Sequence, residues 1–172
     1  MTGFDVVQRQ IWDSQSFRAL PEDERTLFLY LLFNKHRTSF GYYVLDDAYA
    51  AADLQWPVER VRACWPHLIQ SGMVKRDETN RLVLLLNCLR FNPPANPNVA
   101  KHWAERLGTL PPSPLLADLF EASDKYLLEG WQKSWLNGFR NPLPNPSQRV
   151  TQTLPDTSAK GIPNNNPNPN HN

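Results

Sequence analysis

The sequence predicts a mostly α-helical protein of the α+β class, with one small β-hairpin and a C-terminal tail that lacks regular structure. Three observations lead to this prediction. Apolar residues recur at helical spacing in several segments between residues 21 and 139. Two β-prone runs within residues 73–86 flank the polar tip 77–80, which is typical of a hairpin. Residues 141–172 hold seven Pro and eight Asn but no Phe, Trp or Tyr, so they cannot bury enough apolar area to fold.

The first helix is predicted to begin at Pro21 and to fade by Asn34. Proline suits the first turn of a helix, and the three acids that follow it suit the positive end of the helix dipole. The buried stripe of this helix consists of Leu27, Phe28, Leu31 and Leu32. Residues 1–20 lack a clear period, and we expect an N-terminal arm that packs on the core through Ile11, Trp12 and Phe17.

A short strand and two more helices are expected next. Residues 42–45 favour a strand, and Asp46 or Asp47 can cap a short helix over residues 48–54. A third helix is predicted to begin at Pro57. On a helical wheel its two faces separate into an apolar set, Val58, Val61, Trp65, Leu68 and Ile69, and an opposite set, Glu59, Arg60, Ala63, His67 and Gln70.

Two residues bear on where the third helix ends. Pro66 removes a backbone hydrogen bond at a cost of about 3 kcal/mol, so we expect a bend near Trp65 or an early loosening of the helix. Gly72 is predicted to end the helix in the left-handed conformation that glycine adopts without strain.

The second run of the hairpin, residues 82–86, is continuously apolar and is therefore predicted to be the inner strand. Asn96 followed by Pro97 starts a helix that Gly108 stops, and residues 113–139 are predicted to form a further amphipathic helix. The predicted organisation is an N-terminal arm (1–20), a winged helix-turn-helix (21–92), a C-terminal helical extension (93–140) and a disordered tail (141–172).

Composition and motifs exclude several classes of protein. Cys64 and Cys88 are too few for a disulfide framework, and we interpret them as buried free thiols in a reducing cytosol. The sequence shows no signal-peptide pattern and no apolar run near the roughly 18–20 residues of a membrane span, so a cytoplasmic protein without membrane attachment is expected. His67 and His102 could join the two thiols around a metal, but without a Cys-x-x-Cys pair we expect no metal and no cofactor. The chain carries no catalytic motif, so we expect that it is not an enzyme.

The winged helix-turn-helix is predicted from the order of the elements: helix, short strand, short helix, third helix, hairpin. A helix about 10–12 Å across fits the DNA major groove, which is roughly 12 Å wide. Because the apolar stripe of the third helix faces the core, its opposite face is expected to meet the bases. The hairpin would then act as the wing and carry cations toward phosphates.

Charge along the chain indicates the same segment. Residues 1–54 have a balance of −3, whereas residues 55–110 hold eight Lys or Arg against four acids, a balance of +4. The expected DNA contacts are Trp56, Arg60, Arg62, His67, Lys75, Arg76 and Arg81. Ordinary alternatives exist: exposed helix faces are usually charged, cations protect hairpin edges, and a Trp at a helix start usually packs in the core. The acids at two helix starts, Glu22, Asp23, Glu24, Asp46 and Asp47, are interpreted as capping charges.

Four stretches carry a family resemblance: "IWDSQSFRALPEDERTLFLYLLFNKH", "GYYVLDDAYAAADL", "VERVRACWPHLIQSGMVKRD" and "NPPANPNVAKHWAERL". Over residues 11–112 the chain resembles the N-terminal winged-helix domain of phage replication-initiation proteins, also called replisome organisers. In that family a Trp-led arm precedes a helix of this kind, a Gly-Tyr strand follows, and Asn-Pro opens a trailing basic helix. The resemblance implies binding of origin DNA and recruitment of a replicative helicase or its loader.

Two other functions stay open at this point. One is a transcription regulator that uses the same fold, and the other is a protein-interaction module of the replisome that makes no direct contact with DNA. Duplex DNA is the expected partner, and a helicase or helicase loader is the candidate protein partner. A homodimer is also open, with residues 113–137 as the candidate dimer helix.

Overall fold

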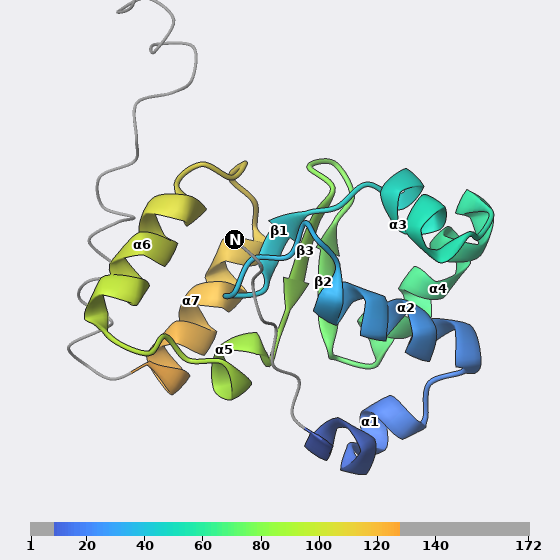
Figure 1. Cartoon of the computed structure of the whole chain (residues 1–172), viewed down its shortest axis with the longest axis horizontal. Helices are drawn as coiled ribbons and strands as arrows, with labels where there is room; N and C mark the ends of the chain where they lie inside the picture. Colours follow the sequence, from blue (N-terminus) through green and yellow to red (C-terminus); the bar gives the residue numbers. More distant parts are fainter. Residues whose placement is uncertain (1–8, 128–172) are drawn as a thin grey trace, which may run out of the picture. The chain divides into compact units, whose positions relative to one another are not determined.

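The computed structural model describes residues 9–127, in which helices lie on both sides of a three-stranded antiparallel sheet (Figure 1). The strands are β1 (Tyr42–Val44), β2 (Val74–Asp77) and β3 (Leu82–Leu85). The helices are η1 (Arg9–Asp13), α1 (Gln15–Arg18), α2 (Glu22–Phe33), α3 (Asp47–Leu54), α4 (Val58–Gln70), α5 (Cys88–Phe91), α6 (Pro97–Leu107) and α7 (Leu115–Tyr126). A mostly helical chain with a small sheet confirms the predicted α+β class.

Several helices begin at the caps that the sequence predicts. Pro21 directly precedes α2, which ends at Phe33. Asp46 caps α3, because its Oδ1 accepts the amide of Ala48 at 2.9 Å. Asn96 caps α6 in the same way by accepting the amide of Val99 at 3.0 Å.

Pro66 does not end α4 early, so the predicted early loosening is wrong, whereas the alternative of a bend near Trp65 stays a prediction. The helix continues to Gln70, and Gly72 follows it with a φ of 71°, as predicted. The reason lies in packing on both sides of the proline: Val61 and Trp65 before it and Leu68 after it are all buried in the core. This burial offsets the backbone hydrogen bond that Pro66 cannot make.

The strand order is β1-β3-β2, so β3 is the inner strand, as predicted. Its residues are buried on both faces of the sheet. Val83 and Leu85 belong to one core cluster, whereas Leu82 and Leu84 belong to the other. This alternation explains why the strand reads as one continuous apolar run.

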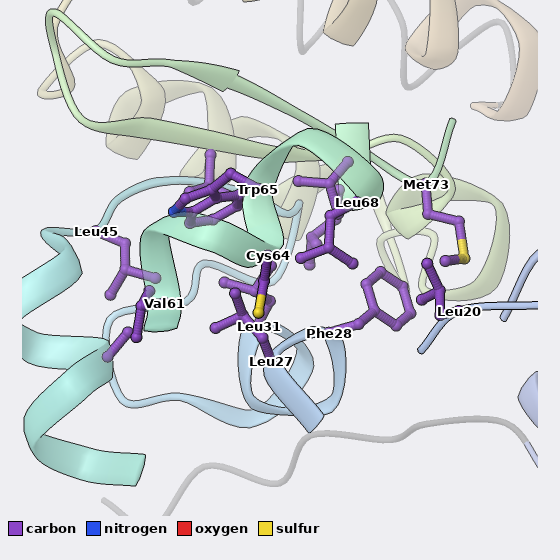
Figure 2. Packing of buried hydrophobic residues seen from close by; sticks show 14 of the residues in the cluster. Leu20, Leu27, Phe28, Leu31, Leu45, Val61, Cys64, Trp65, Leu68 and Met73 are labelled. Carbon is purple, nitrogen blue, oxygen red and sulfur yellow. The ribbon is translucent and has the colours of Figure 1, made fainter. Parts of the chain in front are cut away.

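The first core cluster lies between the sheet and helices α2, α3 and α4. Leu27 and Leu31 of α2 meet Val61 and Leu68 of α4 there, and all four side chains are completely buried (Figure 2). The second cluster lies on the other face of the sheet, where α6 and α7 contribute Ala104, Leu107, Leu115 and Leu119. The hairpin therefore shares a hydrophobic core with the helices that follow it.

The N-terminal arm packs through only part of its predicted set. Phe17 is buried and Ile11 is half-buried against the first cluster, but Trp12 has 59% of its surface exposed. Trp12 instead rests edge-on against Phe17, with ring centroids 5.4 Å apart. Residues 1–8 of the arm, the predicted helical residues beyond 127 and the tail 141–172 lie outside the described residues.

Candidate nucleic-acid interface

The outer face of α4 is exposed, as the helical wheel predicts. Glu59, Arg60, Ala63, His67 and Gln70 are all exposed. Each cation or histidine among the predicted DNA contacts, however, lies within 3.3 Å of a carboxylate oxygen. The pairs are Arg60–Asp23, Arg62–Asp47, His67–Glu24, Lys75–Asp118, Arg76–Asp47 and Arg81–Asp46.

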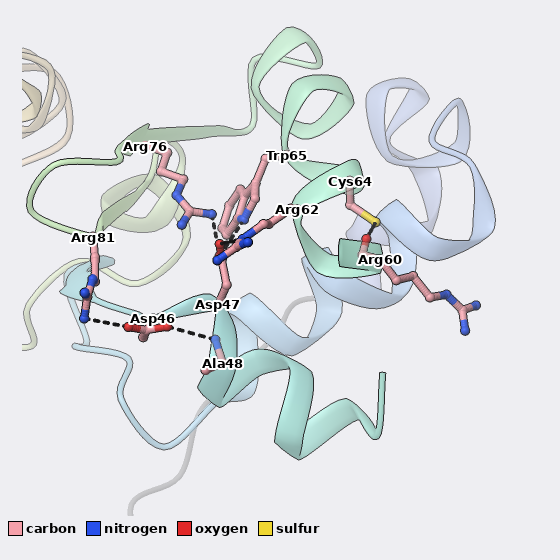
Figure 3. Close-up of polar contacts among 9 residues, drawn as sticks. All are labelled: Asp46, Asp47, Ala48, Arg60, Arg62, Cys64, Trp65, Arg76 and Arg81. Atoms are coloured by element: carbon pink, nitrogen blue, oxygen red, sulfur yellow. Dashed lines mark hydrogen bonds and ion pairs between the residues drawn. The ribbon is translucent and has the colours of Figure 1, made fainter. Parts of the chain in front are cut away.

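Asp47 is the centre of the largest of these groups (Figure 3). Its Oδ1 accepts the indole N–H of Trp65 at 2.9 Å and lies 2.7 Å from Nη1 of Arg76. Its Oδ2 accepts Nε–H of Arg62 at 3.3 Å. Arg76 also stacks on the Trp65 ring, 4.1 Å from the ring centroid. Two guanidinium groups and one indole thus share a single, mostly buried carboxylate.

The structure corrects the expected exposure of Arg76, while its contact with DNA stays a prediction. Its side chain is only 7% exposed, because it lies between Trp65 and Asp47 on the inner side of the hairpin. The sequence places a cation in the wing but does not show that its stem and guanidinium fold inward. Arg76 therefore packs at the edge of the hydrophobic core and does not project from the outer surface of the wing.

Arg81 lies at the tip of the hairpin, on the rim of the same group. Its Nη1 is 2.6 Å from Oδ2 of Asp46, and 63% of its side chain is exposed. Asp46 also caps α3, so one carboxylate stabilises a helix start and holds a wing cation.

Arg60 points away from the hairpin (Figure 3). Its Nε and Nη2 donate to the two carboxylate oxygens of Asp23, at 2.7 and 2.6 Å, and its guanidinium lies 4.2 Å from the centroid of the Trp56 ring. The hydrogen bond from Arg60 lowers the pKa of Asp23, and the same bond raises the pKa of Arg60. Trp56 is half-buried and packs against the first core cluster, so the ring that contacts Arg60 is itself held in place.

His67 stands beside Glu24, with Nδ1 2.6 Å from Oε1. Glu24 is buried although it lies in the first turn of α2. The contact joins the outer face of α4 to α2, as the Arg60–Asp23 pair does nearer the start of α4.

Lys75 and Arg76 lie on opposite faces of the sheet. Lys75 is opposite Leu84, which belongs to the second cluster, and it forms an ion pair with Asp118 of α7. Arg76 is opposite Val83, which belongs to the first cluster. Neighbouring residues of a strand point to opposite sides, so the expectation that the hairpin cations project together with Arg60 is wrong.

Apart from Lys75, which is 43% exposed on the other face of the sheet, three predicted cations keep substantial exposure: Arg60, Arg62 and Arg81, with 48%, 65% and 63% of their side chains exposed. Exposed ion pairs contribute about 0–1 kcal/mol, so a phosphate can replace the carboxylate at little cost. Arg76 lacks this freedom because it is buried. These three arginines are therefore the cations best placed to exchange a carboxylate for a nucleic acid.

A cleft of about 410 Å³ lies between α4, the start of α3 and the hairpin. Trp65, Pro66 and Ile69 form its apolar side. Its charged lining consists of Arg62, Arg76 and Arg81 together with Asp46, Asp47 and Glu78.

The partners of the predicted contacts are acids that the sequence pattern does not single out. Their positions at helix starts predict capping charges, and in the structure Asp23, Glu24, Asp46 and Asp47 all also hold cations or a histidine of the predicted interface. The signal available in the sequence is the −3 balance of residues 1–54 beside the +4 balance of residues 55–110. Opposite charge blocks in neighbouring elements attract each other, so pairing between them is the simplest expectation.

The two cysteines are free and buried, as predicted. Burial raises the pKa of the Cys64 thiol to about 11, and its S–H donates to the Arg60 carbonyl oxygen at 3.2 Å. Within residues 9–127, no group of three or more His, Cys, Asp or Glu is placed to hold a metal ion. None of the helices in the described part of the chain has the length and apolarity that a bilayer crossing requires.

Comparison with known proteins gives no relative. No protein-family model matches the chain, and no curated protein or solved structure matches it either. The resemblance to replication-initiation proteins therefore rests on the four stretches of sequence alone.

Proposed function

We propose that this protein binds duplex DNA as a winged helix, with α4 as the recognition helix and the β2–β3 hairpin as the wing. The observation that carries the proposal is the order α2, β1, α3, α4, β2, β3 together with the strand order β1-β3-β2. In this arrangement α4 holds its apolar side against α2 and α3 and leaves its other side uncovered by the described residues.

The chemistry of the uncovered side of α4 supports the same proposal. Arg60 and Arg62 have exposed guanidinium groups that bind phosphates or guanine edges well, because the planar fork donates two parallel hydrogen bonds. His67 and Gln70 add side chains that donate and accept. Arg81 at the wing tip lies within reach of a phosphate that flanks the groove, since its side chain is exposed.

A role at a replication origin is the biological setting that we propose. It rests on the resemblance of residues 11–112 to the winged-helix domain of phage replication-initiation proteins. The same resemblance proposes a replicative helicase or its loader as the protein partner. Footprinting on the source DNA tests this setting, because sites within a replication gene support it and promoter sites support a transcription regulator.

Anisotropy of a labelled duplex at two salt concentrations tests the DNA binding. Each phosphate that the protein neutralises contributes about −0.9 to the slope of log affinity against log salt. We expect Arg60→Ala and Arg62→Ala each to weaken binding about tenfold. Arg106→Ala, on the exposed surface of α6, is the matched control and should bind as the wild type does. No binding at low salt, or an equal loss in the control, would rule the proposal out.

The ion pairs favour a second function, a protein-interaction module without DNA contact. Six of the predicted contact residues already have carboxylate partners within the chain. A surface whose charges are paired internally adds little long-range attraction for DNA. Under this alternative the duplex does not bind even at low salt, whereas a helicase or loader remains bound after nuclease treatment.

A further inference from the structure

Asp47 pairs with two cations at the cleft between α4 and the hairpin, whose lining holds three arginines and three acids in all. Arg62 and Arg76 are two cations, and they share the single carboxylate of Asp47. Arg81 and Asp46 form a separate pair at the rim, and Glu78 adds a third carboxylate to the lining. Two guanidinium groups on one carboxylate repel each other, and a second anion between them would remove that repulsion.

Arg76 supplies buried donors that make no hydrogen bond. Neither its Nε nor its Nη1 makes a hydrogen bond, although Nη1 is ion-paired with Asp47. The side chain is 7% exposed and lines the cleft. A buried donor without an acceptor is unfavourable, so an acceptor in the cleft would stabilise the site.

The remaining lining limits what the ligand can be. Pro66, Ile69 and Trp65 form an apolar side, and Glu78 is an exposed carboxylate that lines the cleft and opposes an anion. Arg62 is 65% exposed and can turn from Asp47 toward a ligand. The site therefore fits a compact anion that accepts several hydrogen bonds from a buried and an exposed arginine, which is the chemistry of a phosphate group.

We propose that the cleft between α4 and the hairpin binds a phosphate group through Arg62 and Arg76. Arg62 moves from Asp47 to the phosphate, while Arg76 keeps its ion pair with Asp47 and donates Nε–H. When the phosphate belongs to a DNA strand, the inference rests on the proposed function and makes the cleft the place where the backbone lies between helix and wing. A free phosphate or a phosphate monoester would bind by the same contacts.

Side-chain NMR on the full chain tests the site. The reporters are the Nε–H resonance of Arg76 and the indole N–H resonance of Trp65, which both lie beside Asp47. Inorganic phosphate should shift both resonances until they saturate, whereas sodium chloride of equal ionic strength should not. Arg62→Gln should weaken phosphate binding about tenfold, because one charge-assisted contact is lost. Arg106→Gln, the control on α6, should leave it unchanged.

The outcomes separate this inference from the proposed function. If phosphate leaves both reporters where chloride does, or if Arg62→Gln binds phosphate like the wild type, the site does not exist. A short duplex without terminal phosphates provides the second arm. A shift of both reporters by the duplex and by phosphate supports a backbone phosphate in the cleft, and a shift by inorganic phosphate alone supports a site for free phosphate. A duplex that changes no resonance in the spectrum contradicts the proposed function. The titration with inorganic phosphate still tests whether the cleft binds phosphate.

Discussion

Asp23 holds Arg60 in a two-point contact, with hydrogen bonds of 2.7 and 2.6 Å that join the first turn of α2 to the first turn of α4. The same guanidinium also lies over the Trp56 ring, 4.2 Å from its centroid. The arginine that we propose as a DNA contact is therefore oriented in advance by Asp23, and the same carboxylate competes with phosphate for it. Both effects follow from one carboxylate.

Removal of that competitor should strengthen DNA binding. In Asp23→Asn the carboxylate no longer competes with phosphate, and because an exposed ion pair is weak we expect only a modest gain, up to about fivefold tighter binding. Duplex anisotropy at low salt measures this. Glu121→Gln changes the net charge equally on the exposed face of α7 and should give a smaller gain. Equal gains in the two variants would show that only net charge matters.

Arg76 and Arg62 share Asp47 but should differ in their contribution to stability. Arg76→Ala removes a buried cation that packs on Trp65, and we expect a loss of about 3 kcal/mol in the free energy of unfolding. Arg62→Ala removes an exposed partner and should cost less than about 1 kcal/mol. Urea unfolding of the two variants gives the comparison. A similar cost for both would contradict the buried role of Arg76.

Much of the fold follows from local signals in the sequence. Pro21, Asp46, Asn96 and Gly72 mark helix ends by chemistry that acts over one turn, and the structure places all four as predicted. The inner position of β3 follows from its apolar run. Pro66 is different. The cost of its missing backbone hydrogen bond is offset by the burial of neighbouring α4 side chains, and that burial depends on packing against α2 and the sheet.

The candidate site is predicted less well, since it depends on contacts between distant elements. Wheel analysis places Arg60 on the outer face of α4 correctly, but its partner is 37 residues away. Lys75 and Arg76 are adjacent in sequence and therefore look alike as wing cations. The alternation of side chains along a strand separates them, and the sequence pattern alone is enough to apply that rule.

Asp77 should make the hairpin tip sensitive to acid. Hydrogen bonds from Ser113 and Asn80 lower the pKa of Asp77 below its ordinary value. A depressed pKa in the folded state means that this stabilisation is complete above about pH 4 and is lost as the pH falls through the folded pKa.

Asp77→Asn should accordingly be less stable than the wild type at neutral pH, and its stability should fall less on acidification. Thermal unfolding at a series of pH values measures both effects. Glu78→Gln is the control next in sequence, because its carboxylate is exposed to solvent. If Asp77→Asn and the wild type lose the same stability between neutral and acid pH, the bonds to Ser113 and Asn80 do not act as inferred.

Gly41 and Gly72 both have positive φ, 78° and 71°, but only Gly41 lies against another element. A Cβ at Gly41 would stand 2.5 Å from the Cβ of Cys88 and 2.9 Å from its sulfur, whereas a Cβ at Gly72 would meet nothing within 4 Å. Gly72→Ala should therefore cost only the backbone strain, about 1 kcal/mol. Gly41→Ala adds a clash at the junction of β1 and α5 and should cost about 3 kcal/mol or more. Urea unfolding of both variants measures the difference, and equal costs would mean that α5 does not press on the start of β1.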